Sequence, residues 1–193
     1  RAFTADELAR LWISCGQVRR YVGPVKASVW FQALLGVLFY SGERITAILR
    51  VGRDRWHRPW LAVPAEARKG SRKPATYQLP DHVADLVDQV ANHDQPQLFY
   101  WPASHNALRE RWKTITRRAG LGDGTDVQFH ALRRSFASHL SAAGGDAREA
   151  LQHSSEKVTR RYLDPRITQA GQPAPWQLLP RIWPGDEQPP AGA

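Results

Sequence analysis

The chain has 193 residues, and its 27 Lys and Arg residues against 18 Asp and Glu residues give a formal net charge of +9. That length suits one domain of ordinary size, and 42% hydrophobic residues are enough for a buried core, which excludes a wholly disordered chain. The single cysteine, Cys15, excludes a disulfide framework and a cysteine-based zinc site. The longest apolar stretch, residues 29–40, is too short to cross a bilayer. We find no signal peptide, and the start at Arg1 predicts a piece of a longer protein.

The positive charge is concentrated in two stretches. Residues 41–75 contain nine Lys or Arg against three Asp or Glu, and residues 109–164 contain eleven against seven. Residues 76–108, between them, contain four Asp and no Lys or Arg. A fold that brings the two basic stretches together would form an electropositive face, which is typical of nucleic-acid binding because phosphate neutralisation releases counterions. Charge alone leaves open a basic protein without such a partner.

The first half of the chain predicts three helices and a small sheet. Thr4-Ala5-Asp6-Glu7 is a capping-box signature that opens a helix to about Arg20. Residues 26–40 are apolar almost all round, which predicts a central helix that ends at Ser41-Gly42, and a short helix follows over residues 43–49. Residues 53–79 predict an antiparallel sheet with a polar turn built on Lys69-Gly70-Ser71-Arg72-Lys73.

The second half is predicted to be helical up to residue 163. Helices are expected at residues 81–92, 105–119 (capped by Ser104), 130–143, 146–153 and 155–163. Half of the fourteen prolines fall in residues 165–193, which predicts an extended tail whose apolar cluster docks on its own domain or on a neighbouring subunit. The fold class is therefore mainly α with a small antiparallel β-sheet (α+β), with one domain over residues 1–164 and a Pro-rich C-terminal tail over residues 165–193.

Two histidine motifs carry candidate chemistry. In His130-Ala131-Leu132-Arg133 the spacing of three places the imidazole and the guanidinium on one helix face, although a lone His-x-x-Arg is more often structural. Leu151-Gln152-His153-Ser154-Ser155 is followed by Tyr162, nine residues after the histidine. One continuous helix would point His153 and Tyr162 in opposite directions, whereas a new helix that begins at Ser154-Ser155 lets both reach one site. Taken alone, Tyr162 is better explained as an amphipathic tyrosine that anchors a terminal helix.

Two further basic residues stand at turns. Arg44 follows Ser41-Gly42 at the start of the short predicted helix, where a guanidinium and a positive helix end together suit a phosphate. Lys69 lies on the turn of the predicted sheet, where most basic turns are simply solvated.

In this order and with these spacings, the four pieces resemble the catalytic domain of the tyrosine recombinases, the phage integrase family. The family motif Thr-Gly-Leu-Arg-Ile-Ser-Glu-Leu is similar to residues 41–48, and His-x-Leu-Arg-His-Thr-Phe-Ala-Thr-His-Leu is similar to residues 130–140. Leu-Gly-His-Ser-Ser, followed by the nucleophilic tyrosine, is similar to residues 151–162. The resemblance covers about residues 3–164 and implies the fold of that domain.

The resemblance also implies a reaction and a role for each residue. Tyr162 would attack a scissile phosphodiester to leave a 3′-phosphotyrosine and a free 5′-hydroxyl. Arg44, Arg133 and His153 would hold the non-bridging oxygens, Lys69 would protonate the departing 5′-oxygen, and His130 would assist proton removal from the tyrosine. The basic neighbours expected to contact DNA are Arg68, Arg72, Lys73 and Arg134.

The chain departs from the family pattern at four points. Ala47 stands where an acidic residue is common, Glu43 replaces an apolar residue beside Arg44, and Gln152 replaces the glycine before His153. The interval from His130 to His153 is about one helical turn shorter than usual. All six functional side chains are present, which favours an active enzyme.

The expected enzyme is a site-specific DNA strand transferase that needs no metal, no ATP and no other cofactor. Its expected partner is double-stranded DNA, on which it assembles as a tetramer, with neither a membrane nor a small-molecule substrate involved. A prokaryotic or phage-encoded protein in the cytoplasm fits this reading. Two alternatives stay open: a type IB topoisomerase-like enzyme that relaxes DNA, and a catalytically silent DNA-binding relative that acts as a regulator.

Overall fold

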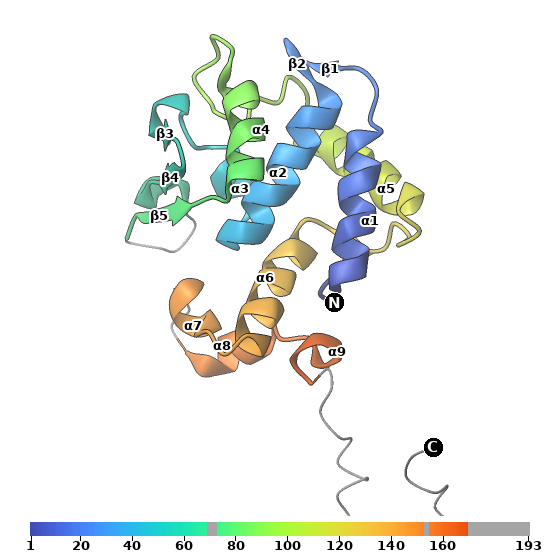
Figure 1. Ribbon diagram of the computed structural model, residues 1–193, viewed down its shortest axis with the longest axis vertical. Coiled ribbons are helices and arrows are strands. Elements are labelled where there is room, and N and C mark those ends of the chain that lie inside the picture. Colours follow the sequence, from blue (N-terminus) through green and yellow to red (C-terminus); the bar gives the residue numbers. More distant parts are fainter. Residues whose placement is uncertain (69–72, 153–154, 170–193) are drawn as a thin grey trace, which may run out of the picture.

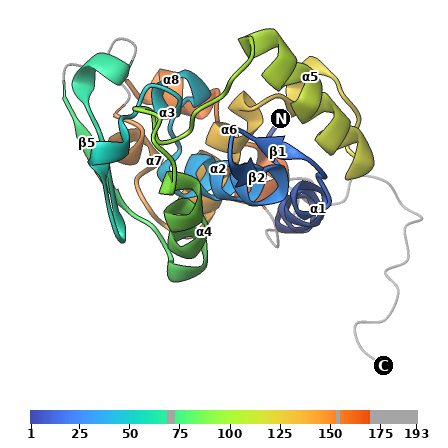
Figure 2. The same cartoon turned by 90° about the horizontal axis from the view of Figure 1, so that it is seen from above.

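The computed structural model describes residues 1–68, 73–152 and 155–169. In Figure 1 the helix α2 (Ala27–Ser41) runs through the middle of the upper part, with α1 (Ala5–Gly16) on one side and α4 (Asp81–Ala91) on the other. The lower part contains α6 (His130–Ala142), α7 (Ala147–Ala150), α8 (Glu156–Arg160) and α9 (Pro165–Thr168). Figure 2 places α5 (His105–Arg118) at the opposite edge of the molecule from the strand β5 (Ala75–Gln78). No helix in the described part of the chain is long and apolar enough to cross a membrane.

The first two helices form as their sequences predict. At α1 the capping box is complete, because the Thr4 hydroxyl accepts from the Glu7 backbone N–H and the Glu7 carboxylate accepts from the Thr4 N–H. Helix α2 is buried along most of its length, and Trp30 and Phe31 pack edge-to-face at 4.9 Å within the main core. It ends at Gly42, whose φ of +63° is the left-handed conformation that closes many helices. The short α3 (Ile45–Ile48) follows directly.

The predicted sheet is present, and a second small one accompanies it. Strands β3 (Trp56–His57), β4 (Trp60–Val63) and β5 pair antiparallel in that order, with Leu61 opposite Tyr77 and Val63 opposite Ala75. The turn at residues 69–72 lies outside the described residues. The additional hairpin joins β1 (Tyr21–Val22) to β2 (Val25–Lys26). Short 3₁₀ helices occur at Arg53–Arg55, Ala65–Ala67 and Thr125–Val127.

Polar contacts fasten the sheet to α4. The Arg58 guanidinium pairs with Asp85 at 2.6 Å and with Asp88 at 2.8 Å, and the Trp56 indole N–H donates to Asp88 at 2.7 Å. On the other side of α2, α5 begins at its predicted cap, where the Ser104 hydroxyl accepts from the Ala107 N–H. The sheet and α5 are therefore separate flanks of one core.

The C-terminal helices differ from the prediction in length and number. The helices expected at residues 146–153 and 155–163 are confirmed only over Ala147–Ala150 and Glu156–Arg160. The prediction of an extended chain from residue 165 is wrong for the first residues of the tail, because Pro165–Thr168 form the helix α9. The reason is local, since the Asp164 carboxylate caps the Arg166 N–H and Pro165 occupies the first helical position. The predicted docking of the tail concerns residues 170–193, which lie outside the described residues.

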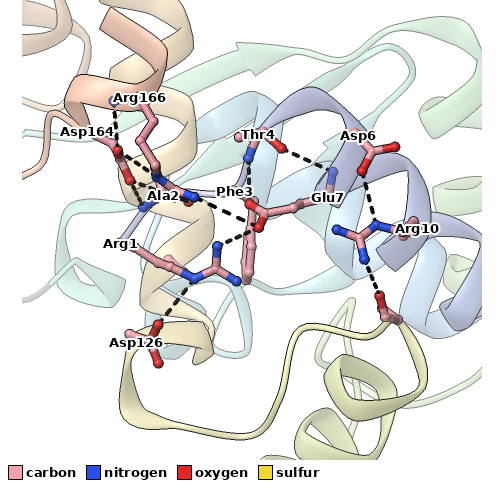
Figure 3. A network of polar contacts seen from close by, with 12 residues as sticks. Arg1, Ala2, Phe3, Thr4, Asp6, Glu7, Arg10, Asp126, Asp164 and Arg166 are labelled. Carbon is pink, nitrogen blue, oxygen red and sulfur yellow. Dashed lines mark hydrogen bonds and ion pairs between the residues drawn. The ribbon is translucent and has the colours of Figure 1, made fainter.

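The first residues of the chain are tied to the segment that follows Tyr162. Figure 3 shows that the Ala2 N–H donates to Asp164, whose carboxylate also accepts from Arg166. The Arg166 guanidinium donates to the Ala2 carbonyl at 2.7 Å. The hydrogen bond from Arg166 to the Asp164 carboxylate lowers the pKa of Asp164 to about 2. The Phe3 N–H donates to the Ser135 hydroxyl on α6 at 2.7 Å. Residues at the two ends of the described chain therefore hold one another in place.

Candidate active site

The structure brings four of the predicted site residues together beside the N-terminal end of α6. His130 is the first residue of α6, and its ring lies 5.1 Å from the ring of Tyr162, edge to face. The guanidinium carbon of Arg133 lies 5.7 Å from the centre of the same tyrosine ring. Arg44 is close enough that its charge lowers the pKa of both His130 and Arg133. Residues from three separate motifs therefore share one site.

Arg133 is buried and held by two backbone carbonyls. Its Nη1 donates to the Gly42 carbonyl at 2.6 Å, and its Nη2 donates to the Leu151 carbonyl at 3.2 Å. Only 3% of the residue is exposed, and burial, followed by the nearby positive charge of Arg44, lowers its pKa. These contacts join the end of α2, the helix α6 and the loop after α7. The guanidinium is thus fixed in orientation before any ligand binds.

Arg44 is placed by the chain reversal at the end of α2. Gly42 takes the left-handed conformation, and a Cβ there would meet the Phe136 ring at 2.4 Å and a Leu151 methyl group at 2.9 Å. The Arg44 N–H donates to the carboxylate of its neighbour Glu43 at 3.3 Å. The predicted helix start contributes little, because α3 has a single turn. The positive charge at this position therefore comes from the guanidinium.

Tyr162 is positioned by α6 as well as by its own segment. The Ser138 hydroxyl donates to the Tyr162 carbonyl at 3.2 Å and accepts from the Asp164 N–H at 2.9 Å. The tyrosine side chain is half-buried against a small cluster that includes Phe136 and Leu151. The sequence run after Arg133 gave no reason to single out Ser138. Its importance depends on the docking of residues 162–164 against α6.

The remaining predicted residues fall into two groups. Lys69, Arg72 and His153 lie outside the described residues, and their roles stay predictions. Lys73 is exposed and Arg134 is half-buried. Arg68 differs from the expectation of an exposed basic neighbour: its side chain is 4% exposed, and its Nε pairs with Glu43 at 2.5 Å. A direct contact of Arg68 with DNA would require this ion pair to open.

Two further observations complete the chemistry of the site. Arg134, Arg133 and Arg44 all place positive charge near His130, so the site is electropositive. Within the part of the chain that the structure describes, no group of three or more His, Cys, Asp or Glu side chains could hold a metal ion. The arrangement suits an anion that accepts hydrogen bonds from planar guanidinium groups.

The imidazole of His130 is expected to titrate far below its ordinary range. Its pKa is lowered to about 4, first because the surrounding side chains displace water and then because of the charges of Arg134, Arg133 and Arg44. In the free chain, NMR titration of the histidine ring protons should therefore give a midpoint near 4 for the signal that disappears in His130→Gln. A DNA phosphate adds negative charge and should raise that midpoint. A midpoint near the ordinary 6.5 would contradict the electropositive surroundings.

The sequence is similar to those of known proteins. Residues 2–168 match the model of the phage integrase family. This chain belongs to that family. It is 30% identical over 176 residues to the tyrosine recombinase XerC of Brucella suis, and this match covers 84% of the chain and 54% of the relative. It is 29% identical over 141 residues to XerC of Chromohalobacter salexigens, which covers 68% of the chain and 47% of the relative. The integrase-family chain thus spans about half the length of the curated relatives it matches.

Solved structures agree on the fold. The integrase-family chain matches the XerA recombinase with a TM-score of 0.70 at 17% identity, over 94% of this chain and 66% of that one. It matches the catalytic domain of bacteriophage HP1 integrase with a TM-score of 0.63 at 18% identity, over 88% of this chain and 92% of that domain. The predicted fold class, mainly α with a small antiparallel sheet, is therefore confirmed as that of a tyrosine recombinase catalytic domain.

Proposed function

We propose that this chain is the catalytic part of a site-specific recombinase that cleaves and rejoins DNA through a 3′-phosphotyrosine. The observation that carries the proposal is the buried guanidinium of Arg133, oriented by the Gly42 and Leu151 carbonyls, directly beside the ring of Tyr162. A nucleophilic hydroxyl next to preorganised cationic donors is what an attack on a phosphodiester requires. The family membership supports the same reaction class.

In the proposed cleavage step, the Tyr162 hydroxyl oxygen attacks the scissile phosphorus and forms the new P–O bond. His130 takes the phenol proton, for which its neutral form at neutral pH is suited, because its pKa is lowered to about 4. The bond from phosphorus to the 5′-oxygen breaks, and that oxygen takes a proton from Lys69 to become a free 5′-hydroxyl. Atoms and charge balance without water, and a second DNA 5′-hydroxyl reverses the step.

The rate enhancement comes mainly from positioned positive charge. A phenol has a pKa near 10 and is a poor nucleophile at neutral pH, so removal of its proton has to be assisted. Arg44 and Arg133 would each stabilise the charge that develops on the non-bridging oxygens, and removal of one such donor typically costs about 10²–10³-fold in rate. His153 would add a third donor. In this mechanism side-chain donors do the work, and the phosphotyrosine conserves the bond energy that ATP would otherwise supply.

Structures of similar proteins suggest which partner this chain binds and how it assembles. A XerH recombinase is described bound to its difH substrate, and a lambda integrase tetramer is described bound to a Holliday junction. We extend both properties to this chain: it binds double-stranded DNA and acts as a tetramer in a prokaryotic cytoplasm. Lys73 and Arg134 are the described residues proposed to contact the DNA backbone beside the site.

A nicked suicide DNA duplex tests the proposal. When the strand end diffuses away after cleavage, the parent chain should accumulate a covalent 3′-adduct that peptide mapping assigns to Tyr162. Tyr162→Phe should keep its fold and its DNA affinity but form no adduct, because the ring remains and only the nucleophilic oxygen is lost. Tyr21→Phe, at a side chain that is exposed on the β1–β2 hairpin, is the matched control and should cleave normally.

The alternatives give different outcomes in the same assay. A silent DNA-binding relative would bind the duplex and form no adduct with the parent chain. A topoisomerase-like enzyme would form the adduct and relax supercoiled DNA, but it would not exchange strands between two duplexes. An adduct that persists in Tyr162→Phe would mean that another residue is the nucleophile.

A further inference from the structure

A buried ion pair lies behind the active site. The Arg68 Nε and a Glu43 carboxylate oxygen are 2.5 Å apart, with side chains that are 4% and 1% exposed. Burying two charges is costly unless the pair is close and the remaining polar atoms also find partners. The chain could have avoided that cost with apolar residues, so the pair calls for an explanation other than stability.

Further contacts extend the pair into a network. The Tyr77 hydroxyl on β5 donates to the same carboxylate oxygen of Glu43 at 2.7 Å. The Nη1 of Arg68 donates to the side-chain carbonyl of Gln152 at 2.6 Å and to the backbone carbonyl of Lys73 at 3.0 Å. Burial, and then the charge of Glu43, raises the pKa of Tyr77, so its hydroxyl stays protonated as a donor. The sheet, the end of α2 and the loop after α7 thus meet in one cluster.

Gln152 has an uncommon backbone conformation beside this cluster. Gln152 has a φ of +52°, a left-handed conformation that costs a non-glycine residue free energy. Gln152 directly follows the C-cap of α7, where its N–H donates to the Glu149 carbonyl at 2.9 Å, and a left-handed residue is common at such helix ends. The hydrogen bond from Arg68 then holds the Gln152 side chain at this helix end.

The members of the network share a place in the sequence. Glu43 directly precedes Arg44, Arg68 directly precedes Lys69, and Gln152 directly precedes His153. Each of the three therefore stands one peptide unit before a residue of the proposed mechanism. Two of them, Glu43 and Gln152, are departures from the family pattern, and the structure shows that these departures contact one partner, Arg68.

We propose that Glu43, Arg68 and Gln152 form a positioning cluster that fixes the relative placement of the three catalytic segments that follow them. Arg68 is then a positioning residue and not a DNA contact. The inference rests on the proposed function for Lys69 and His153, but it concerns residues to which that mechanism assigns no role. The buried guanidinium of Arg68 contacts Glu43 and Gln152, which are 25 and 84 positions away in the sequence.

The test compares oxygen and sulfur leaving groups. A 5′-bridging sulfur leaves without taking a proton, so it makes cleavage insensitive to the general acid. Arg68→Met alone would leave Glu43 as an unpaired buried charge, so the working variant is the double change Glu43→Leu/Arg68→Met, which removes both charges. It should slow both substrates, because Arg44 and His153 are displaced as well, but it should slow the oxygen substrate at least tenfold more than the sulfur substrate, because only the oxygen substrate also needs Lys69. Lys69→Ala is the reference and should show the same selective rescue.

The control and the contrary outcomes separate the two hypotheses. Arg58→Met removes an exposed ion pair from the same sheet and should leave the sulfur-to-oxygen rate ratio unchanged. The positioning role would be overturned if the double change slowed both substrates equally, or slowed neither, in an experiment in which Lys69→Ala does show rescue by sulfur. A parent chain without an adduct, or Lys69→Ala without rescue, would count against the proposed function instead.

Two measurements that need no activity complete the test. In urea unfolding, Arg68→Met and Gln152→Gly should be non-additive, because each removes the same hydrogen bond, whereas additive effects would contradict the network. DNA affinity measured against salt should give the same slope for the parent and the double variant. A slope reduced by about 0.9 would instead identify Arg68 as a phosphate contact and overturn the proposal.

Discussion

Arg133→Lys is expected to lower the single-turnover rate of adduct formation by about 10²–10³-fold. Lysine keeps the positive charge but lacks the planar fork, and so it cannot reach the Gly42 and Leu151 carbonyls and a phosphate together. The rate should be measured with saturating DNA, so that weaker binding does not contribute. Thermal unfolding of the same sample shows whether the variant is folded.

Arg10→Lys is the matched control for this change. Arg10 also donates from its guanidinium to a backbone carbonyl, that of Ala119 at 3.0 Å, but on the α1–α5 side of the molecule. Its replacement should leave the cleavage rate within about twofold. If Arg133→Lys cleaves as fast as Arg10→Lys, the oriented guanidinium is not what stabilises the transition state, and the proposed role of Arg133 is wrong.

Gly42→Ala is expected to lower the free energy of unfolding by about 3 kcal/mol, which combines left-handed strain with crowding. The added Cβ would lie 2.4 Å from the Phe136 ring and 2.9 Å from a Leu151 methyl group. Chemical denaturation with urea measures the change, and the melting temperature should fall by about 6–12 °C for a domain of this size. Because the Gly42 carbonyl holds Arg133, cleavage measured well below the melting temperature should also be slower.

Gly144→Ala separates the two contributions. Gly144 has a φ of +83°, but a Cβ there meets nothing within 4 Å. This variant should lose only the conformational part, about 1 kcal/mol, and should cleave like the parent. Equal destabilisation by the two changes would show that crowding at Gly42 is unimportant.

Much of the fold follows from local sequence signals. The capping box at Thr4, the cap at Ser104 and the apolar helix that ends at Gly42 are all present where they were expected. Two missed elements also had local signals. Gly23-Pro24 between short extended segments is a turn signature for the β1–β2 hairpin, and Asp164-Pro165 is a cap followed by a first-turn proline.

The site was predictable only in part, and the reason is physical. The motifs identified Arg44, His130, Arg133 and Tyr162 as a set, and the structure places these four together. The partner of Arg68 could not be predicted, because an exposed basic turn residue and a buried ion-pair member have the same local sequence. Pairing across 25 residues with Glu43, and across 84 with Gln152, depends on how the sheet packs beside α2.

The tie between Ala2, Phe3 and the end of the domain has a consequence for synthesis on the ribosome. Its hydrogen bonds join residues 132 and 162 positions apart, so Ser135 and Asp164 are synthesised long after Phe3 and Ala2. At ordinary translation speeds, about 8–30 s pass between the synthesis of Ala2 and the synthesis of Asp164. The nascent chain can form α1, α2 and the sheet during that time, while the segment that carries Tyr162 has yet to dock. An incomplete chain therefore lacks the docked segment that carries Tyr162, the proposed nucleophile, and this segment can make its contacts with Ala2 only after Arg166 has been synthesised.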